Sequence, residues 1–128
     1  MATKMIFAHF DGDDVGPALE LLLLDNLPQR AREYSEAVRE AFDVLCQILA
    51  QNPDVKVIVA GGDDLVASWP EGSVEISKLE ELRSSFHKTC GRTMSIGVGT
   101  STTEAVHNLH RAKLMGKDQV VVPTVMAD

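Results

Sequence analysis

The sequence predicts an α+β domain whose core has the order βαββαβ, the ferredoxin-like arrangement with helices packed on a mainly antiparallel sheet. Three observations predict it. Short apolar runs alternate with longer segments in which apolar residues recur every three or four positions. Two of these runs flank a Gly-Gly turn, as in a β-hairpin. The length of 128 residues suits one domain, residues 1–128, and neither a repeat nor a linker is evident.

The first two elements are a strand and a helix. Residues 5–10 form a mostly apolar run, as in a central strand covered on both faces. A helix is expected over residues 15–24, with Asp13 or Asp14 as its N-cap. Its leucine-rich part, residues 19–24, is predicted to lie in the core, with a dimer face as the alternative.

A long amphipathic helix is expected next. It opens at Pro28 and ends near residues 51–53, since apolar residues repeat at helical spacing between these points. A β-hairpin follows over residues 55–67, and the chain then leaves the sheet at Trp69, which is predicted to be a packing residue. Ser77 and Glu80 have the spacing of a capping box at the start of a third helix.

The last third of the chain predicts strand, helix and strand. In the strand over residues 93–100, Gly97 and Gly99 permit close approach of another backbone or a bulge. A second capping box begins at Ser101 and opens a helix that Gly116 ends. Residues 119–122 form the last strand.

Two acidic motifs follow strand-like runs, and each could be only a turn, because Asp and Gly are common in turns. Their joint occurrence favours a cation site, since magnesium prefers carboxylates together with substrate phosphates. If the two strands are neighbours, Asp11 and Asp63 lie side by side at one edge of the sheet. The motifs are Asp11-Gly12-Asp13-Asp14 and Gly61-Gly62-Asp63-Asp64.

The formal charge of −7 and the lack of a Lys/Arg-rich run argue against a polynucleotide template, because phosphate contacts require basic surfaces. Small nucleotides delivered with magnesium remain compatible with this charge. No apolar run is long enough to span a membrane, and residues 1–4 do not resemble a signal peptide. A cytoplasmic protein is therefore expected, with Cys46 and Cys90 as thiols.

Four blocks of the sequence carry a resemblance to known proteins: residues 10–16, 61–64, 95–99 and 112–120. Together they resemble the palm domain of class III nucleotidyl cyclases, of GGDEF-type cyclases and of type III CRISPR cyclase/polymerase subunits. A chain of this length is similar to the minimal CRISPR polymerase (mCpol) family. The resemblance spans nearly the whole chain, and the blocks occur in the order of the family.

The resemblance implies a role for each motif residue. The catalytic acids would be Asp11, Asp63 and Asp64, with the Gly12 carbonyl assisting them in holding two Mg²⁺ or Mn²⁺ ions. Lys113 would reach the phosphates and Lys117 would assist it, although a solvated helix residue is the alternative for Lys113. The nucleotide-binding set is completed by the backbone of Asp13, Asp14, Val15 and Gly16 and by Gly62.

The implied reaction makes a cyclic dinucleotide or oligonucleotide from ATP or another nucleoside triphosphate, with pyrophosphate release, as a second messenger in anti-phage defence. Cyclic di-AMP is the preferred type. One active site holds one activated triphosphate, so a homodimer is expected, and a downstream effector would bind the product. The alternatives are a catalytically silent nucleotide sensor and a purely structural ferredoxin-like module. Surface or packing roles are expected for His9, His87, His107 and His110.

Overall fold

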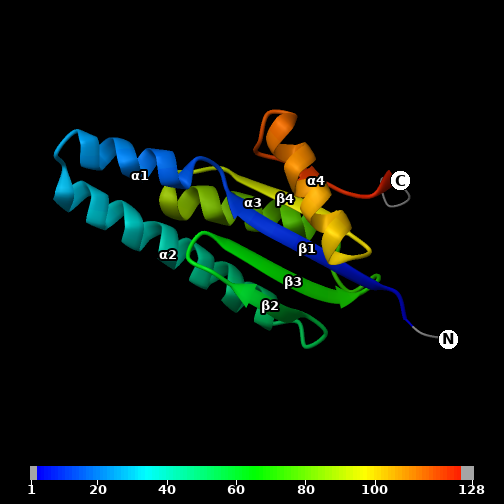
Figure 1. The fold of residues 1–128 in the computed structure, drawn as a ribbon. Coiled ribbons are helices and arrows are strands. Elements are labelled where there is room, and N and C mark those ends of the chain that lie inside the picture. The colour runs from blue at the N-terminus through cyan, green and yellow to red at the C-terminus, as the bar shows by residue number, and fades with distance from the viewer. Residues whose placement is uncertain (1–2, 125–128) are drawn as a thin grey trace.

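The computed structural model describes residues 3–124, and it confirms the predicted order of strands and helices (Figure 1). Four helices and five strands are present in this part of the chain. They are β1 (Met5–Gly12), α1 (Val15–Leu24), α2 (Pro28–Ala50), β2 (Lys56–Ala60), β3 (Asp64–Pro70), α3 (Ile76–Cys90), β4 (Met94–Gly99), α4 (Thr102–Leu114) and β5 (Val120–Val121).

The strands form one sheet in the order β2-β3-β1-β4-β5, with β1 at its centre. All neighbouring pairs are antiparallel except β4 and β5, which are parallel. In this register Asp11, near the end of β1, lies opposite Asp64 of β3 on one side and Ser95 of β4 on the other. Both acidic motifs therefore meet at the same end of the sheet.

One face of the sheet carries the hydrophobic core under α2 and α3. Phe10 lies opposite Leu65 and Ile96, and all three side chains are fully buried. The rings of Phe42 and Phe86 join α2 to α3 edge to face, with centroids 5.1 Å apart. Trp69 is also buried in this core, which confirms its packing role.

Helix α4 covers the opposite face, over β4 and β1, and packs unusually close to the sheet (Figure 1). A Cβ atom on Gly97 would lie 2.6 Å from the Cα of Leu109, and it would overlap backbone atoms of both Leu109 and Ala105. The predicted close approach at Gly97 is thus confirmed. Ser101 caps the helix by accepting a hydrogen bond from the Glu104 amide at 3.1 Å, as predicted.

Three predictions about the elements are wrong. No residue of α1 is buried, so its leucines do not lie in the core: α1 packs on α2, and the two helices project as a hairpin beyond the sheet (Figure 1). Helix α3 begins at Ile76 with Glu75 as its N-cap, so Ser77 lies inside the first turn and makes no capping box. Strand β3 continues through Trp69 to Pro70.

Over the described range 3–124, none of the helices combines the length and apolar character that a membrane span requires.

We predict that Gly97→Ala destabilises the fold by about 3 kcal/mol, the upper range for overpacking, because the added methyl group meets backbone atoms of α4. Chemical denaturation would measure the loss. Gly16→Ala is the matched control, since a Cβ at Gly16 meets nothing within 4 Å. Equal stability of the two variants would contradict the close packing of α4 on β4.

Candidate active site

The centre of the site is a pair of carboxylates on adjacent strands. Asp11 and Asp64 are register partners across the β1–β3 ladder, and partner side chains of an antiparallel pair lie about 5 Å apart on the same face. Like charges placed in this way destabilise a sheet. The neighbouring residues must therefore offset the repulsion, or a bound cation must do so.

Asp64 is held from two sides. His9, on β1, contacts the Oδ2 atom of Asp64 through Nε2 at 3.1 Å. The Oδ1 atom fills the space beside Gly61, where a Cβ would overlap it. The first glycine of the hairpin turn thus leaves room for the carboxylate of the second aspartate.

Lys113, in the last turn of α4, binds several oxygen atoms of the first acidic motif. Its Nζ atom lies 3.0 Å from Oδ2 of Asp11 and 2.6 Å from Oδ1 of Asp13, and it also donates to the Gly12 carbonyl at 3.3 Å. The close packing of α4 at Gly97 brings this ammonium group to the end of β1. Lys113 thereby offsets part of the negative charge at the site.

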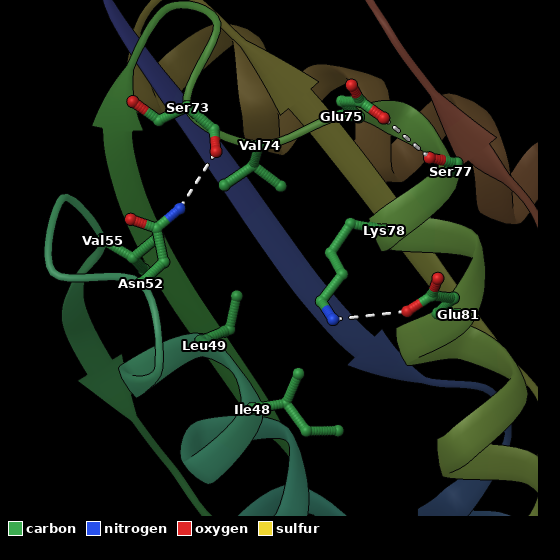
Figure 2. A pocket seen from close by; sticks show the side chains of 10 residues that line it. All are labelled: Ile48, Leu49, Asn52, Val55, Ser73, Val74, Glu75, Ser77, Lys78 and Glu81. Atoms are coloured by element: carbon green, nitrogen blue, oxygen red, sulfur yellow. Dashed lines mark hydrogen bonds and ion pairs between the residues drawn. The ribbon is translucent and has the colours of Figure 1, made fainter.

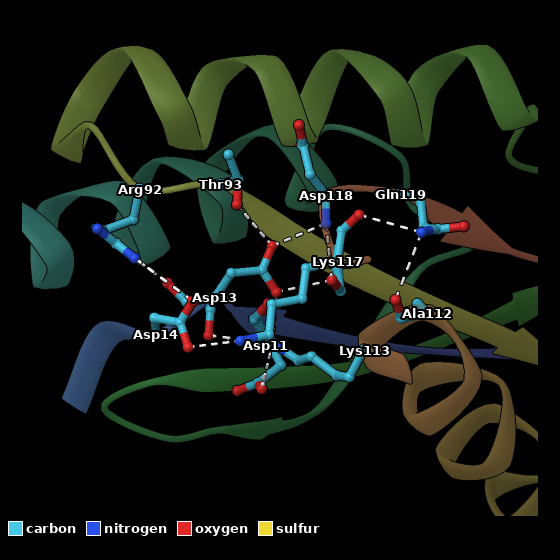
Figure 3. A network of polar contacts seen from close by, with 12 residues as sticks. Asp11, Asp13, Asp14, Arg92, Thr93, Ala112, Lys113, Lys117, Asp118 and Gln119 are labelled. Atoms are coloured by element: carbon cyan, nitrogen blue, oxygen red, sulfur yellow. Dashed lines mark hydrogen bonds and ion pairs between the residues drawn. The ribbon is translucent and has the colours of Figure 1, made fainter. Parts of the chain in front are cut away.

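Asp13 is the buried anchor of the surrounding loops (Figure 3). Its carboxylate accepts hydrogen bonds from the hydroxyls of Thr93 and Ser95, each at 2.7 Å, and from the Asp118 amide at 3.0 Å. Its own amide donates to the Thr93 carbonyl at 2.9 Å. Asp13 therefore ties the loop after β1 to β4 and to the α4–β5 loop.

These contacts shift the pKa values of the buried acids in opposite directions. Burial raises the pKa of Asp11; the hydrogen bond and charge of Lys113 offset this only in part, and the charge of Asp63 adds to the rise. Burial also acts to raise the pKa of Asp13, but the hydrogen bonds from Lys113, Ser95 and Thr93 outweigh it, so that pKa is lowered. The neighbours of Asp13 thus outweigh the effect of burial on its pKa, whereas the neighbours of Asp11 do not.

The loop between β1 and α1 is fixed by cations on its outer side. Asp14 is the N-cap position of α1 in a left-handed conformation, and its side chain makes no capping hydrogen bond. Instead it pairs with Lys117 at 2.6 Å and with Arg92 at 3.7 Å (Figure 3). The hydrogen bond and charge of Lys117 lower the pKa of Asp14. The predicted N-cap position is confirmed at Asp14, but the Asp14 side chain forms ion pairs with Lys117 and Arg92 and does not cap the helix.

Two connected cavities open beside these residues. We call the first the acidic cavity; its volume is about 380 Å³, and it is lined by Asp11, Gly12, Asp14, Val15, Gly16, Pro17, Asp63, Lys113 and Lys117. We call the second the helix-pair cavity; its volume is about 270 Å³, and it is lined by Val15, Gly16, Leu19, Tyr34, Ser35, Val38, Arg39, Gly62 and Asp63. They share Val15, Gly16 and Asp63, so one elongated ligand could occupy both.

A further cavity of about 260 Å³ lies at the other end of β3, between the end of α2 and the start of α3 (Figure 2). Its polar side chains are already paired with one another or with the backbone. Asn52 donates to the Ser73 carbonyl at 3.0 Å, and Lys78 pairs with Glu81 at 3.3 Å. Neither acidic motif contributes to its lining.

Comparison with known proteins identifies the family. The model of the minimal CRISPR polymerase domain, mCpol, matches residues 7–123. The chain belongs to the mCpol family. This membership supports a nucleotide cyclase-like or polymerase-like role for the domain. A comparison with curated proteins finds no match.

Solved structures confirm that the mCpol fold is a palm. A Csm1–Csm4 cassette in complex with cA4 matches with a TM-score of 0.70 and 17% identity over 95% of this chain. Csm1 of T. onnurineus matches with a TM-score of 0.66 and 19% sequence identity over 94% of this chain. The chain spans about a fifth of those Csm1 chains, 22% and 21%. A GGDEF domain studied with cyclic di-GMP matches with 0.64 and 18% identity, covering 93% of this chain and 76% of that domain.

The structure brings most of the predicted site residues of this mCpol domain together. Eight line the acidic cavity, and Gly62 lines the adjoining one. Asp13 is the exception among the predicted phosphate-binding residues, because its side chain is buried and its amide already donates to Thr93. The predicted pairing also differs in detail: Asp64, not Asp63, is the register partner of Asp11.

Sequence analysis missed the partners of these acids. His9 was expected to have only a surface or packing role, yet it contacts Asp64, while the other three histidines are exposed as expected. Its place two residues before Asp11 puts both side chains on one face of β1, and this alternation could have revealed it. Thr93 and Ser95 contact Asp13 from about 80 positions away, and no local pattern signals such a contact.

The oxygen atoms around Lys113 suit a hard cation. An ammonium group already lies against carboxylate oxygens of Asp11 and Asp13 and the carbonyl of Gly12, which are oxygen donors of the kind that magnesium takes. Within residues 3–124, no three His, Cys, Asp or Glu side chains are grouped as a ready-made metal site.

We predict that Asp13→Asn lowers the free energy of unfolding by about 3 kcal/mol at pH 7, because it leaves Lys113 without its shortest carboxylate contact in a mostly buried setting. The measurement is denaturant unfolding. Since folding lowers the pKa of Asp13, its contribution is present above the ordinary pKa and is lost as the pH falls through the folded value. The gap between wild type and variant should shrink in acid, and a gap that grows would contradict the role of Asp13.

Proposed function

We propose that this domain is a nucleotidyltransferase that joins nucleoside triphosphates, with ATP preferred, into a cyclic dinucleotide of the cyclic di-AMP type or a larger cyclic oligonucleotide. The observation that carries the proposal is the opposed pair Asp11 and Asp64 at one end of the sheet, where Asp11, Asp63 and Lys113 line an open cavity. Structurally similar Csm1 assemblies are complexes with ATP, cA3 and cA4, which supports nucleotides as ligands.

The acidic cavity suits a triphosphate. The first amides of a helix have no partner within the helix, so Val15 and Gly16 at the start of α1 offer donors to phosphate oxygens. Lys113 and Lys117 add positive charge to the lining of the same cavity. Asp13 is omitted from this set because its amide is already used.

The helix-pair cavity suits the nucleoside. Leu19 and Val38 provide apolar walls for a base, and Ser35 and Arg39 offer polar contacts at its edge. Tyr34 shapes the cavity, because its hydroxyl donates to the Val15 carbonyl at 3.1 Å and ties α2 to the first turn of α1. Base choice would therefore rest on residues of both helices.

In the proposed reaction a ribose hydroxyl of one nucleotide attacks the α-phosphorus of the other. A new P–O bond forms, the bond between the α- and β-phosphates breaks, and pyrophosphate leaves. Divalent cations held by Asp11, Asp63, Asp64 and the Gly12 carbonyl would lower the pKa of the attacking hydroxyl and offset the charge of the leaving group. The chain itself orients the phosphates through Lys113 and the start of α1.

A cyclic product requires two such reactions, so two active sites should face each other in a homodimer. Helix α1 offers the surface for it, because Leu21, Leu23 and Leu24 are 61%, 57% and 73% exposed beside the cavity that Leu19 lines. Glu20 is the only charged residue of α1, so a second copy could pack against it without repulsion between like charges. We propose that the product is a second messenger in anti-phage defence, read by an effector that binds cyclic nucleotides.

We predict that wild-type protein mixed with Mg²⁺ and ATP releases pyrophosphate and forms a cyclic phosphodiester, and that Asp63→Ala abolishes both, because the attacking hydroxyl is no longer activated. Mass spectrometry of the products with each of the four triphosphates would identify the base and the ring size. Asp43→Asn, which changes an exposed carboxylate on α2, is the control and should retain activity.

Circular dichroism should show that Asp63→Ala keeps the fold. Binding of Mg²⁺ and ATP without any product by wild type would favour a silent sensor. Absence of a magnesium-dependent thermal shift with ATP would favour a structural module.

We predict that the double variant Leu21→Glu/Leu24→Glu is a monomer at concentrations where the wild type is a dimer, since both side chains lie on one face of α1. Sedimentation equilibrium would measure the masses. Leu114→Glu, which alters a leucine of nearly equal exposure on α4, should remain dimeric. A dimer that survives the double variant would place the interface elsewhere.

A further inference from the structure

His9 is a polar residue at a position of the sheet where packing alone does not require a polar side chain. It lies on the α4 face of β1, opposite Val66 of β3 and Gly97 of β4. Its side chain is only 18% exposed. An apolar side chain would fill this position of the sheet without needing a hydrogen-bond partner.

The two ring nitrogens of His9 have different surroundings. Nε2 lies 3.1 Å from Oδ2 of Asp64, and an ionised carboxylate only accepts hydrogen bonds, so Nε2 is the donor. Nδ1 is buried without a partner. A buried nitrogen that lacks a partner costs free energy, so the contact with Asp64 is the feature that accounts for an imidazole at this position.

His9 and Gly61 together define where the Asp64 carboxylate can lie. Gly61 lacks the Cβ that would overlap Oδ1, and its amide donates to the Asp64 carbonyl at 3.0 Å. His9 fixes the other oxygen from the adjacent strand, β1. Asp64 is thereby turned to the face of the sheet that Asp11 shares, while Lys113 forms ion pairs with Asp11 and Asp13.

We propose that His9 is a positioning residue, which holds the Asp64 carboxylate beside Asp11 through its hydrogen bond to Oδ2 and so sets the affinity of this acid pair for a divalent cation. The inference rests on the proposed function, because cation uptake by the pair is part of it. Hydrogen bonds from a second layer of residues orient metal-binding carboxylates, and their loss costs tenfold or more in affinity in known sites.

The test compares His9→Phe, which keeps a ring of similar shape without a donor, with His9→Gln, whose amide restores a donor. His110→Ala removes an exposed imidazole from α4 and is the control. Binding of Mn²⁺ in the presence of a non-hydrolysable ATP analogue would be followed by electron paramagnetic resonance. Crystal structures of the variants would show the direction of the Asp64 side chain.

We expect His9→Phe to bind Mn²⁺ about tenfold more weakly or worse, with Asp64 turned away, and His9→Gln to recover most of the affinity. The turnover of His9→Phe should fall at low Mg²⁺ and recover at high Mg²⁺, which a general loss of stability would not produce. Equal Mn²⁺ binding by wild type and His9→Phe, or an unmoved Asp64, would overturn the role of His9. Failure of the wild type itself to bind Mn²⁺ would instead overturn the proposed function, and the cation part of this inference with it.

Discussion

The repulsion between two opposed carboxylates governs the architecture of this end of the sheet. Asp11 and Asp64 face each other across an antiparallel ladder, where like charges cost stability. Lys113 reaches one of them from α4, and His9 holds the other from β1. The fold therefore has to bring α4 very close to the sheet, and Gly97 and Gly99 make that approach possible.

The five aspartates of the two acidic motifs have different roles in the structure, although they look alike in the sequence. Asp13 is buried with a full set of donors, and its lowered pKa reflects that compensation. The pKa of Asp11 is raised because burial exceeds the help from Lys113. An acid that its neighbours leave under-compensated is the one that gains most from an added cation. The structure thus separates Asp13, which anchors the loops, from Asp11, which lines the acidic cavity.

The strands, the hairpin turn and the long helix could be predicted because each leaves a local pattern in the sequence. The Gly-Gly turn between apolar runs and the helical spacing of α2 are features of this kind. Helix α1 could not be placed, because a run of leucines has no periodicity that tells a buried helix from an exposed one. The capping box predicted at Ser77 is wrong because the helix begins two residues earlier than that box requires, at Ile76.

The residues of the candidate site also divide into those that a local sequence pattern predicts and those that it does not. Its acids stand in short motifs, so their residues could be named from the sequence. Their partners come from β1, β4 and the α4–β5 loop, and the contacts of Asp13 span about 80 to 105 positions. A shift of one residue in the β1–β3 register decides whether Asp63 or Asp64 faces Asp11. That register is set by the pairing of the two strands in three dimensions.

Helix α1 depends on α2 for its packing. None of its residues is buried, and its first turn is tied to α2 by the Tyr34 hydroxyl. The helix-pair cavity lies between these two helices, so a bound nucleoside would add contacts to both. A ligand that binds only the folded arrangement stabilises it in proportion to its affinity. The same helix exposes its leucines beside the helix-pair cavity, which Leu19 lines, so nucleotide binding and the packing of a second copy would stabilise one element and each would favour the other.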